Sequence, residues 1–434
     1  MQLIKRNSVN SSSPEIGPKS GFGRRYFPAF RHRYYRWYFW GQSISLIGLW
    51  VQNTALANLV FRTTESPFLL GLITFLGQIP ILILGPFAGV LADRHSRHRI
   101  VVITQILLMA QALVLTVFVF RGYSQFWVLG VFSLILGTIV SFDLPARQAL
   151  VIELVGREDL PNAIALGSLL FNSARGVGPA LAAPFLLLYD EGWFFLVNGL
   201  TYMVVIAPMV RMRLKPRAVV QPTGGFLSNI VEAFDFVRSH IALRDILLNV
   251  GMISVLLIPH AVLLPAVARE IVGEYQPQDY ARLLAVSGFG ALAGALLFIR
   301  GTWDPTSARL IPLGGIMFAL TLIAFSFSPS IRVASTLLVP AGVSMMIQTI
   351  GTNTFVQSLV PDRYRGRVLS FMTTMFLGFI PIGSLVLGAL ANFFGALVVI
   401  RCAASICLLG SLLLLSRASI IRASIDELRR LGHS

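Results

Sequence analysis

The chain has 434 residues, of which 55% are hydrophobic and only 12% are charged, and its formal net charge is +16. This composition is more apolar than that of an ordinary soluble domain. A large soluble helical protein would need a polar face on most of its helices, and these faces are missing. The sequence therefore predicts an all-α membrane protein.

Twelve apolar stretches follow one another along the chain, and each is long enough for a transmembrane helix of about 20 residues. Trp37, Trp40 and Trp193 stand at the start of two of them, as expected for an aromatic belt at a membrane interface. The expected fold is twelve transmembrane helices in two pseudo-symmetric six-helix bundles, 37–210 and 244–416. The expected spans are 37–61, 68–92, 100–120, 124–143, 163–189, 192–210, 244–268, 281–299, 309–328, 332–355, 368–393 and 396–416.

Polar segments flank and separate the two bundles. Residues 1–36 are basic and rich in Ser and Gly, which predicts a disordered cytoplasmic tail and not a cleaved signal peptide. Residues 211–243 form a basic cytoplasmic linker that continues as an amphipathic helix suited to the inner membrane surface. Residues 417–434 form a second basic cytoplasmic tail.

The basic residues are distributed unevenly between the two sides of the predicted membrane. With both termini cytoplasmic, 28 of the 35 Lys and Arg residues lie on the cytoplasmic side, five lie on the other side, and Arg175 and Arg401 lie within spans. This asymmetry follows the positive-inside rule, which fixes the orientation of the chain in the membrane. It explains the net charge without a nucleic-acid partner.

The two halves carry matching residues at a constant offset of 205. Four glycine pairs fall on this offset: Gly85 and Gly290, Gly89 and Gly294, Gly137 and Gly342, and Gly178 and Gly383. Duplicated six-span halves are typical of secondary transporters, which bind their substrate between the halves near the membrane midplane. The Gly-x-x-x-Gly pairs at 85–89 and 290–294 also predict close helix–helix approach.

The stretch GPFAGVLADRHSRHR crowds one acid and several bases into a few positions after an uncharged span. We expect Asp93 to meet the start of span 11, in PDRYRGRVLSF, when the inner side of the protein is shut. Under the alternative, the bases only anchor the topology. The predicted gate residues are Asp93, Arg94, Arg97, Arg99, Arg363, Arg365, Gly366 and Arg367.

GVLADRHSRHR resembles the motif between spans 2 and 3 of the major facilitator superfamily, with Ser96 in place of the usual glycine. Five longer stretches resemble one branch of it, the enterobactin-exporter-like and macrolide-efflux-like proteins: SLIGLWVQNTALANLV, FDLPARQALVIELVGREDLPNAIAL, FNSARGVGPALAAP, LVPDRYRGRVLSF and PIGSLVLGAL. The resemblance runs from about Trp37 to Ser416. It implies an inner-membrane exporter that is commonly taken to be proton-driven, with an inner gate at Asp93 and a hinge in span 5 at Gly176, Gly178 and Pro179.

Spans 1 and 10 line the cavity in this superfamily, which makes their polar residues candidates for the substrate pathway. Bonds between helices explain each of these residues about as well, taken singly. Asn58 stands where that branch usually has Trp, and His260 stands where it usually has Tyr, so the substrate cannot be transferred from relatives. The candidates in these two spans are Gln52, Asn53, Asn58, Gln348, Asn353 and Gln357.

Arg175 lies near the middle of span 5, where a charged side chain is costly and often functional. It could bind an anionic substrate or close a polar network with Asn172. Alternatively, it satisfies backbone carbonyl groups that Pro179 leaves unpaired. Both interpretations remain open.

The coupling ion is expected to be the proton, but no acid stands in the centre of a span. Asp143 lies four residues before Arg147, which suits either a gate or a structural salt bridge. His260, between Pro259 and Pro265, is a histidine within a span and can titrate near neutral pH.

The sequence contains no phosphate-binding loop, no nucleophile elbow and no His/Cys cluster with metal spacing, so we expect neither an enzyme nor a cofactor. Cys402 and Cys407 point to different faces of one helix and should not pair. The predicted function is secondary export of a small amphipathic molecule by a monomer in contact with membrane lipid. The alternatives are an importer of the same fold and a membrane sensor or lipid-handling partner that transports nothing.

Overall fold

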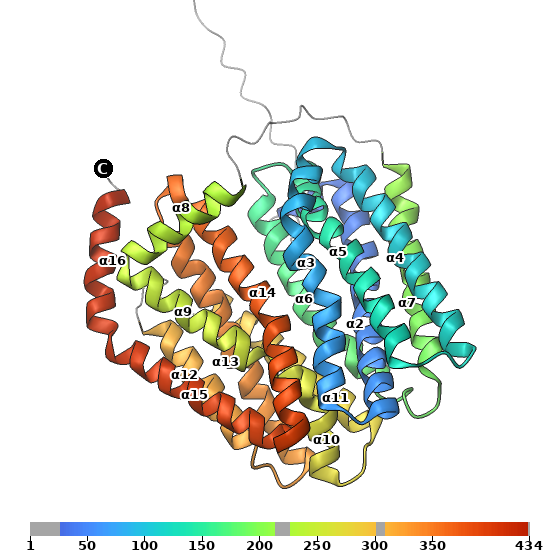
Figure 1. Cartoon of the computed structure of the whole chain (residues 1–434). Helices are drawn as coiled ribbons and strands as arrows, with labels where there is room; N and C mark the ends of the chain where they lie inside the picture. Colours follow the sequence, from blue (N-terminus) through green and yellow to red (C-terminus); the bar gives the residue numbers. More distant parts are fainter. Residues whose placement is uncertain (1–26, 213–225, 301–308, 433–434) are drawn as a thin grey trace, which may run out of the picture.

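The computed structural model describes residues 27–212, 226–300 and 309–432. In this part of the chain every regular element is a helix, and the helices lie side by side in one elongated body (Figure 1). Most of the predicted N-terminal tail and the basic start of the linker lie outside the described residues.

The N-terminal half begins with a short 3-10 helix, η1 (Pro28–Arg31), and α2 starts earlier than the predicted position 37. Ala29 and Tyr35 are fully buried in the cluster that contains Leu150 and Met209, so this part of the expected tail is packed against the bundle. The six long helices of this half are α2 (Arg33–Thr64), α3 (Pro67–Arg94), α4 (Arg97–Phe120), α5 (Phe126–Val155), α6 (Leu160–Ala182) and α7 (Glu191–Arg211).

The C-terminal half begins with a broken span, in which the short 3-10 helix η2 separates two helices. Pro259 and Pro265 flank His260 at this break, since proline removes backbone hydrogen bonds from a helix. The elements of this half are α9 (Ile241–Leu256), η2 (Ile258–Leu263), α10 (Leu264–Val272), α11 (Pro277–Arg300), α12 (Leu310–Phe325), α13 (Ile331–Leu359), α14 (Asp362–Phe394) and α15 (Ala396–Ser416).

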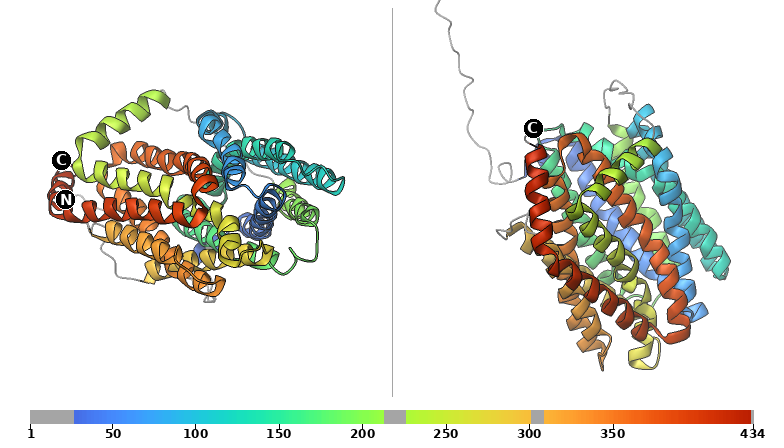
Figure 2. Two further views of the ribbon diagram at one scale, coloured as in Figure 1. Left: turned by 60° about the horizontal axis from the view of Figure 1, so that its bottom comes forward. Right: turned by 60° about the vertical axis from the view of Figure 1, so that its left-hand side comes forward.

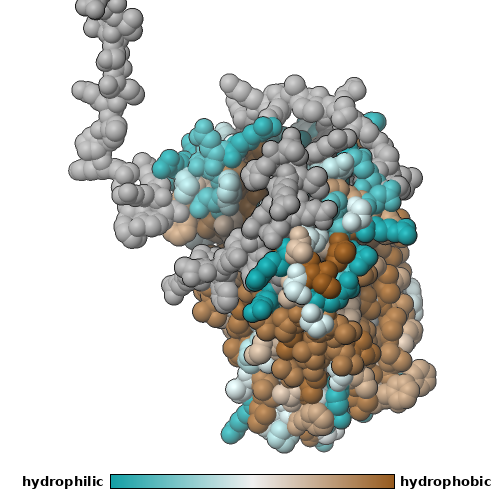
Figure 3. Space-filling view, turned by 90° about the vertical axis from the view of Figure 1, so that its left-hand side faces the viewer, coloured by the Kyte–Doolittle hydropathy of each residue, from teal (hydrophilic) through white to brown (hydrophobic). Residues whose placement is uncertain are grey.

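Ten segments of the described chain are long and apolar enough to cross a membrane. The two expected spans outside this set correspond to α12, which has only 16 residues, and to α6, which carries Asn172 and Arg175. Both still pack inside the bundles, α12 between α13 and α15 and α6 against α2 and α11. The surface in Figure 3 is hydrophobic over a broad band, with hydrophilic residues gathered above it.

The predicted duplication is visible in how matching helices pack. A methyl group on Gly178 of α6 would lie 2.5 Å from Cβ of Trp50 on α2, and one on Gly383 of α14 would collide with the carbonyl of Val255 on α9. Trp50 and Val255 are themselves 205 residues apart. The same helix pair therefore packs through the same positions in both halves.

The expectation of close approach at the two Gly-x-x-x-Gly pairs is right for one pair and wrong for the other. Gly290 and Gly294 lie so close to the backbone of α13, at Val339 and Val343, that a side chain would collide there. A methyl group on Gly85 or Gly89 of α3 would meet no atom within 4 Å. This stretch of α3 therefore has no close helix neighbour among the described residues in this conformation.

The halves meet along two seams, α3 with α14 and α6 with α11. The 205-residue offset exchanges these two pairs, so the seams are related by the pseudo-symmetry. Figure 2 shows the N-terminal half, in blue to green, on one side of the molecule and the C-terminal half, in yellow to red, on the other. A site between the halves is therefore bordered by α3, α6, α11 and α14.

The amphipathic helix expected in the linker is α8 (Phe226–Ser239), and it packs on α14. The rings of Phe236 and Tyr364 are stacked with centroids 4.4 Å apart, and Glu232 pairs with Arg367. A further helix, α16 (Ala418–Gly432), follows α15 in the segment expected to be a tail. We call the end of the molecule with α8 and α16 the linker end, and the opposite end the α10 end (Figure 1).

Candidate transport pathway and its gates

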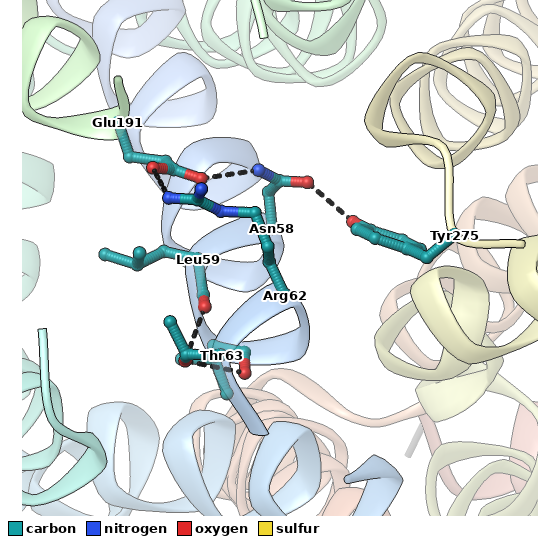
Figure 4. Close-up of polar contacts among 7 residues, drawn as sticks. Asn58, Leu59, Arg62, Thr63, Glu191 and Tyr275 are labelled. Atoms are coloured by element: carbon teal, nitrogen blue, oxygen red, sulfur yellow. Dashed lines mark hydrogen bonds and ion pairs between the residues drawn. The ribbon is translucent and has the colours of Figure 1, made fainter. Parts of the chain in front are cut away.

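A cluster of four residues at the α10 end joins the two halves (Figure 4), with Asn58 and Glu191 buried and Arg62 exposed. Nδ2 of Asn58 donates to Glu191 Oε1 at 2.7 Å, and Arg62 Nη2 lies 2.8 Å from Glu191 Oε2. The hydroxyl of Tyr275, from the C-terminal half, donates to Asn58 Oδ1 at 2.6 Å. We call Asn58, Arg62, Glu191 and Tyr275 the α10-end latch.

Local sequence explains how the latch is placed. Asn58 and Arg62 are four residues apart on α2 and therefore share a face. Glu191 is the first residue of α7, where a carboxylate is stabilised by the positive end of the helix dipole. Asn58 and Glu191 are only 1% and 3% exposed, so the hydrogen bond between them is shielded from water.

Tyr275 enters the latch from the connection between α10 and α11. Its ring meets Phe61 edge-on, with centroids 4.9 Å apart. Burial raises the pKa of the Tyr275 hydroxyl well above its usual range. The hydroxyl therefore stays protonated, and able to donate to Asn58, at pH values where a free tyrosine would ionise.

Two further polar contacts join the halves at the same end. Arg269 lies 2.7 Å from Glu65, and Ser66 Oγ donates to Asn392 Oδ1 at 3.1 Å. Arg175 Nη2 also reaches the sulfur of Met345 across the halves, at 4.0 Å. The α10 end is thus closed by bonded contacts.

At the linker end, two of the predicted gate residues, Arg97 and Arg367, each pair with an acid of their own half. Arg97 pairs with Glu153 of α5 at 3.1 Å, and Arg367 pairs with Glu232 of α8. Arg94 and Arg99 are exposed. The side chains of Asp93, Arg363 and Arg365, and the surroundings of Gly366, lie outside the described part, so their pairing stays a prediction.

Asp143 is fully buried and pairs with Arg147, as the spacing predicted. Two side chains of α4 also donate to its Oδ1, Thr104 at 2.7 Å and Gln105 at 3.0 Å. All four residues belong to the N-terminal half. This geometry favours a structural salt bridge that fastens α4 to α5 over a gate between the halves.

Several predicted pathway residues are buried inside one half. Gln52 accepts a hydrogen bond from Asn198 of α7 at 2.7 Å, and Gln348 packs against Gly314 of α12. Asn172 donates to the carbonyl oxygen of Ser168 on its own helix, at 2.8 Å. For these residues the geometry favours contacts within and between helices over a pathway.

His260 is also buried. Its Nδ1 lies 2.7 Å from the carbonyl oxygen of Leu257, and its ring meets Phe318 edge-on, with centroids 5.7 Å apart. The imidazole is 2% exposed, and its Nε2 has no hydrogen-bond partner among the described residues. It therefore packs as a core residue of the C-terminal half with one unused polar atom.

Accessible polar residues remain on α2 and on the linker-end part of α13. Asn53 is half-buried, and Asn353 and Gln357 are exposed. Gln357 Nε2 donates to Asn353 Oδ1 at 2.7 Å. These three are therefore the accessible residues among those predicted on spans 1 and 10.

The predicted hinge is a crossing point of unbroken helices. α6 continues through Gly176, Gly178 and Pro179 to Ala182. A methyl group on Gly288 of α11 would lie 2.5 Å from Cα of Gly176, so the two backbones touch there. The halves thus contact each other backbone to backbone beside Arg175.

An open groove of about 570 Å³ lies between α6 and α11, lined among others by Ala183, Pro184, Arg282 and Phe289. None of the predicted pathway residues lines it. It belongs to the surface of the seam between α6 and α11.

No motif in the sequence singles out Glu191, Tyr275, Glu65 or Arg269. A usable signal was present on α2, because Asn58 and Arg62 form an i,i+4 polar pair beside Glu65. The partners could not be foreseen, since Tyr275 lies 217 residues from Asn58 in the chain.

Comparison with known proteins agrees with this architecture. The family model described as "Transmembrane secretion effector", of the major facilitator superfamily, matches residues 25–428. The staphyloferrin A transporter of Staphylococcus aureus is 23% identical over 363 residues, which are 82% of this chain and 90% of that protein. Macrolide efflux protein A of Streptococcus pyogenes is 31% identical over 150 residues, which are 35% of this chain and 36% of that protein.

Among solved structures, a bacterial homologue of the human lysosomal transporter Spinster, in an inward-facing and unoccupied conformation, has a TM-score of 0.65 at 16% identity. The match covers 91% of this chain and 98% of that one and shows the shared fold. Proteins of this fold and family are membrane transporters and not enzymes. The chain therefore belongs to the transmembrane secretion effector family of the major facilitator superfamily.

Proposed function

We propose that this chain exports a small amphipathic molecule across the inner membrane by alternating access. The observation that carries the proposal is the difference between the two ends of the molecule. Contacts such as that of Tyr275 with Asn58 join the halves at the α10 end, whereas at the linker end Arg97 and Arg367 each pair with an acid of their own half. A substrate would enter at the linker end in this conformation.

The direction of export is supported by charge and by the relatives. The linker end carries most of the basic residues and is therefore assigned to the cytoplasm, together with both chain termini. One relative is an efflux protein for macrolides and another transports a staphyloferrin. We infer a siderophore-, drug- or metabolite-like substrate that a monomer takes up from the cytoplasmic side.

The moving units are the two six-helix halves, 37–210 and 244–416, and α8 moves with the second because it packs on α14. Asn353 and Gln357 line the entrance, Asn53 lies farther along α2 toward the α10 end, and Asp93 with the start of α14 closes the entrance in the opposite state. The contact of Gly176 with Gly288 is kept in both states.

Protons are the proposed driving ion. His260 lies in η2, where the helix is interrupted, and an interrupted span is tolerated where it is buried in protein or lines a cavity. Its unused Nε2 is the atom that a proton would occupy.

The test is uptake into inside-out vesicles that contain the protein, with a panel of siderophores, macrolides and other amphipathic compounds. A pH gradient should drive accumulation, and a protonophore should abolish it. Accumulation only in right-side-out vesicles would indicate an importer. No transport of any compound in either orientation would favour the non-transporting alternative.

A cross-link between the halves at the α10 end is a second test of the proposal, and a cross-link within one half is its matched control. Cysteines at Ser66 and Asn392, which are joined across the halves, should stop transport when a short dithiol-reactive linker joins them. Cysteines at Asn249 and Ser411, 3.2 Å apart within the C-terminal half, should leave transport intact when they are joined. Equal effects of both pairs would contradict alternating access at this end.

A further inference from the structure

Arg401 is an arginine within a span whose hydrogen-bond donors have acceptors in the protein. Its Nε donates to Ser326 Oγ and its Nη2 to the carbonyl oxygen of Ser326, both at 3.1 Å. The guanidinium carbon also lies 3.7 Å from the ring centroid of Phe327. Both donors on the side-on edge of this guanidinium are thus occupied by oxygen atoms of the protein.

Arg175 lacks such partners. Its Nε is buried and has no hydrogen bond, and its Nη2 has only the sulfur of Met345 at 4.0 Å, a weak acceptor. No acidic side chain of the described chain lies within ion-pair distance of it. A cation in the middle of a span without an oxygen partner is costly, and such groups are a sign of function.

The wall beside Arg175 is aromatic and held in place. The ring centroid of Trp50 lies 6.0 Å from the guanidinium carbon of Arg175. Trp50 is fixed between Gly178, where a side chain would collide with it, and Phe171, whose ring it meets at 5.9 Å. Its indole Nε1 is also buried without a hydrogen-bond partner among the described residues.

The site is shared by both halves. Arg175 and Trp50 belong to the N-terminal half and Met345 belongs to the C-terminal half. The backbone crossing of Gly176 and Gly288 lies directly beside them. A molecule bound here would contact both moving units at the middle of their interface, where transporters of this architecture bind substrate.

We propose that Arg175 and Trp50 form a subsite for the carboxylate of an amphipathic substrate. The two carboxylate oxygens accept hydrogen bonds from Nε and Nη2 of Arg175, and the apolar part of the substrate lies on Trp50 and Phe171. This inference rests on the proposed transport of a small amphipathic molecule and adds its chemical class.

A carboxylate fits this edge better than a neutral group. The spacing of its two oxygens matches two parallel guanidinium N–H groups, and each hydrogen bond is charge-assisted. A primary amide of the same skeleton offers one oxygen and directs an NH₂ group at the second donor. The site should therefore distinguish an acid from its own amide.

The experiment measures binding of 1-pyrenebutyrate and of its primary amide to the purified full-length protein in nanodiscs, by pyrene fluorescence. Wild-type protein should bind the acid at least tenfold more tightly than the amide. Arg175→Gln should reduce this ratio to near one, and Arg175→Lys should retain part of it. Arg401→Gln, the matched control, should leave the ratio unchanged.

Equal binding of acid and amide by wild-type protein, no binding of either, or an undiminished ratio in Arg175→Gln would overturn the proposal. If Arg175→Gln does not fold, Arg175→Lys decides, because a purely structural arginine predicts no change in the ratio. Selective binding of the acid without transport in vesicles would contradict the proposed exporter and leave the subsite standing. Transport that shows no preference for acids would contradict the subsite and leave the proposed exporter standing.

Discussion

The hydroxyl of Tyr275 makes one hydrogen bond across the closed α10 end, so Tyr275→Phe tests how that end is held. The substitution removes the donor to Asn58 and keeps the ring contact with Phe61. One hydrogen bond contributes about 0.5–1.5 kcal/mol. Since 1.4 kcal/mol corresponds to a factor of ten, the population with an open α10 end should rise by about 2- to 12-fold.

The assay follows a cysteine at position 53, which should be reached from the α10 end only when the latch is open. The two natural cysteines, Cys402 and Cys407, are unpaired and are first replaced by serine. Right-side-out vesicles are treated with a membrane-impermeant maleimide. The labelling rate at position 53 should rise in Tyr275→Phe by the same factor as the open population.

Tyr280→Phe is the matched control, because it removes a hydroxyl from a second buried tyrosine nearby. The Tyr280 hydroxyl makes no hydrogen bond to the N-terminal half in the described structure. If Tyr275→Phe labels no faster than Tyr280→Phe, the hydrogen bond to Asn58 does not hold the α10 end shut.

Three further substitutions test other parts of the mechanism. Asp93→Asn should abolish transport at near-normal abundance and raise cysteine labelling from the cytoplasmic side; unchanged transport would exclude a gate role. His260→Gln should weaken transport driven by a pH gradient but spare substrate counterflow, whereas equal loss of both would indicate a packing role. Gly288→Ala should slow transport in the vesicle assay, because its methyl group would lie 2.5 Å from Gly176, and Gly167→Ala, with open space around it, should not.

The order of helices could be predicted because apolar length and glycine position are local properties of the chain. The predicted offset of 205 reappears in the packing of Gly178 on Trp50 and of Gly383 near Val255. Helix ends were less certain. Packing of Tyr35 against the bundle extends α2 beyond the apolar run that defined the first span.

The direction of polar side chains could not be predicted from the sequence. Gln52 and Asn58 both lie on the polar first span, but one bonds Asn198 within its own half and the other bonds Tyr275 across the halves. A hydrogen bond within one half and a hydrogen bond between the halves need the same types of side chain. Only the three-dimensional neighbours distinguish them, and those neighbours are far away in the chain.

Conformational state also limits prediction. Gly85 and Gly290 occupy matching positions, but only Gly290 meets a helix backbone in this conformation. A sequence motif states which surfaces can approach closely. It does not state in which step of a cycle they do so.

The crossing of Gly176 with Gly288 can serve as the pivot about which the two halves rotate. Sixteen residues separate Gly176 from Leu160, the first residue of α6, which is about 24 Å of helix at 1.5 Å per residue. A tilt of about 15° about the crossing would move that end by roughly 6 Å while the glycines hardly shift. A small rotation can thus separate the helix ends by several ångströms at the membrane surface. Arg175 lies next to the pivot and therefore keeps nearly the same surroundings during the rotation.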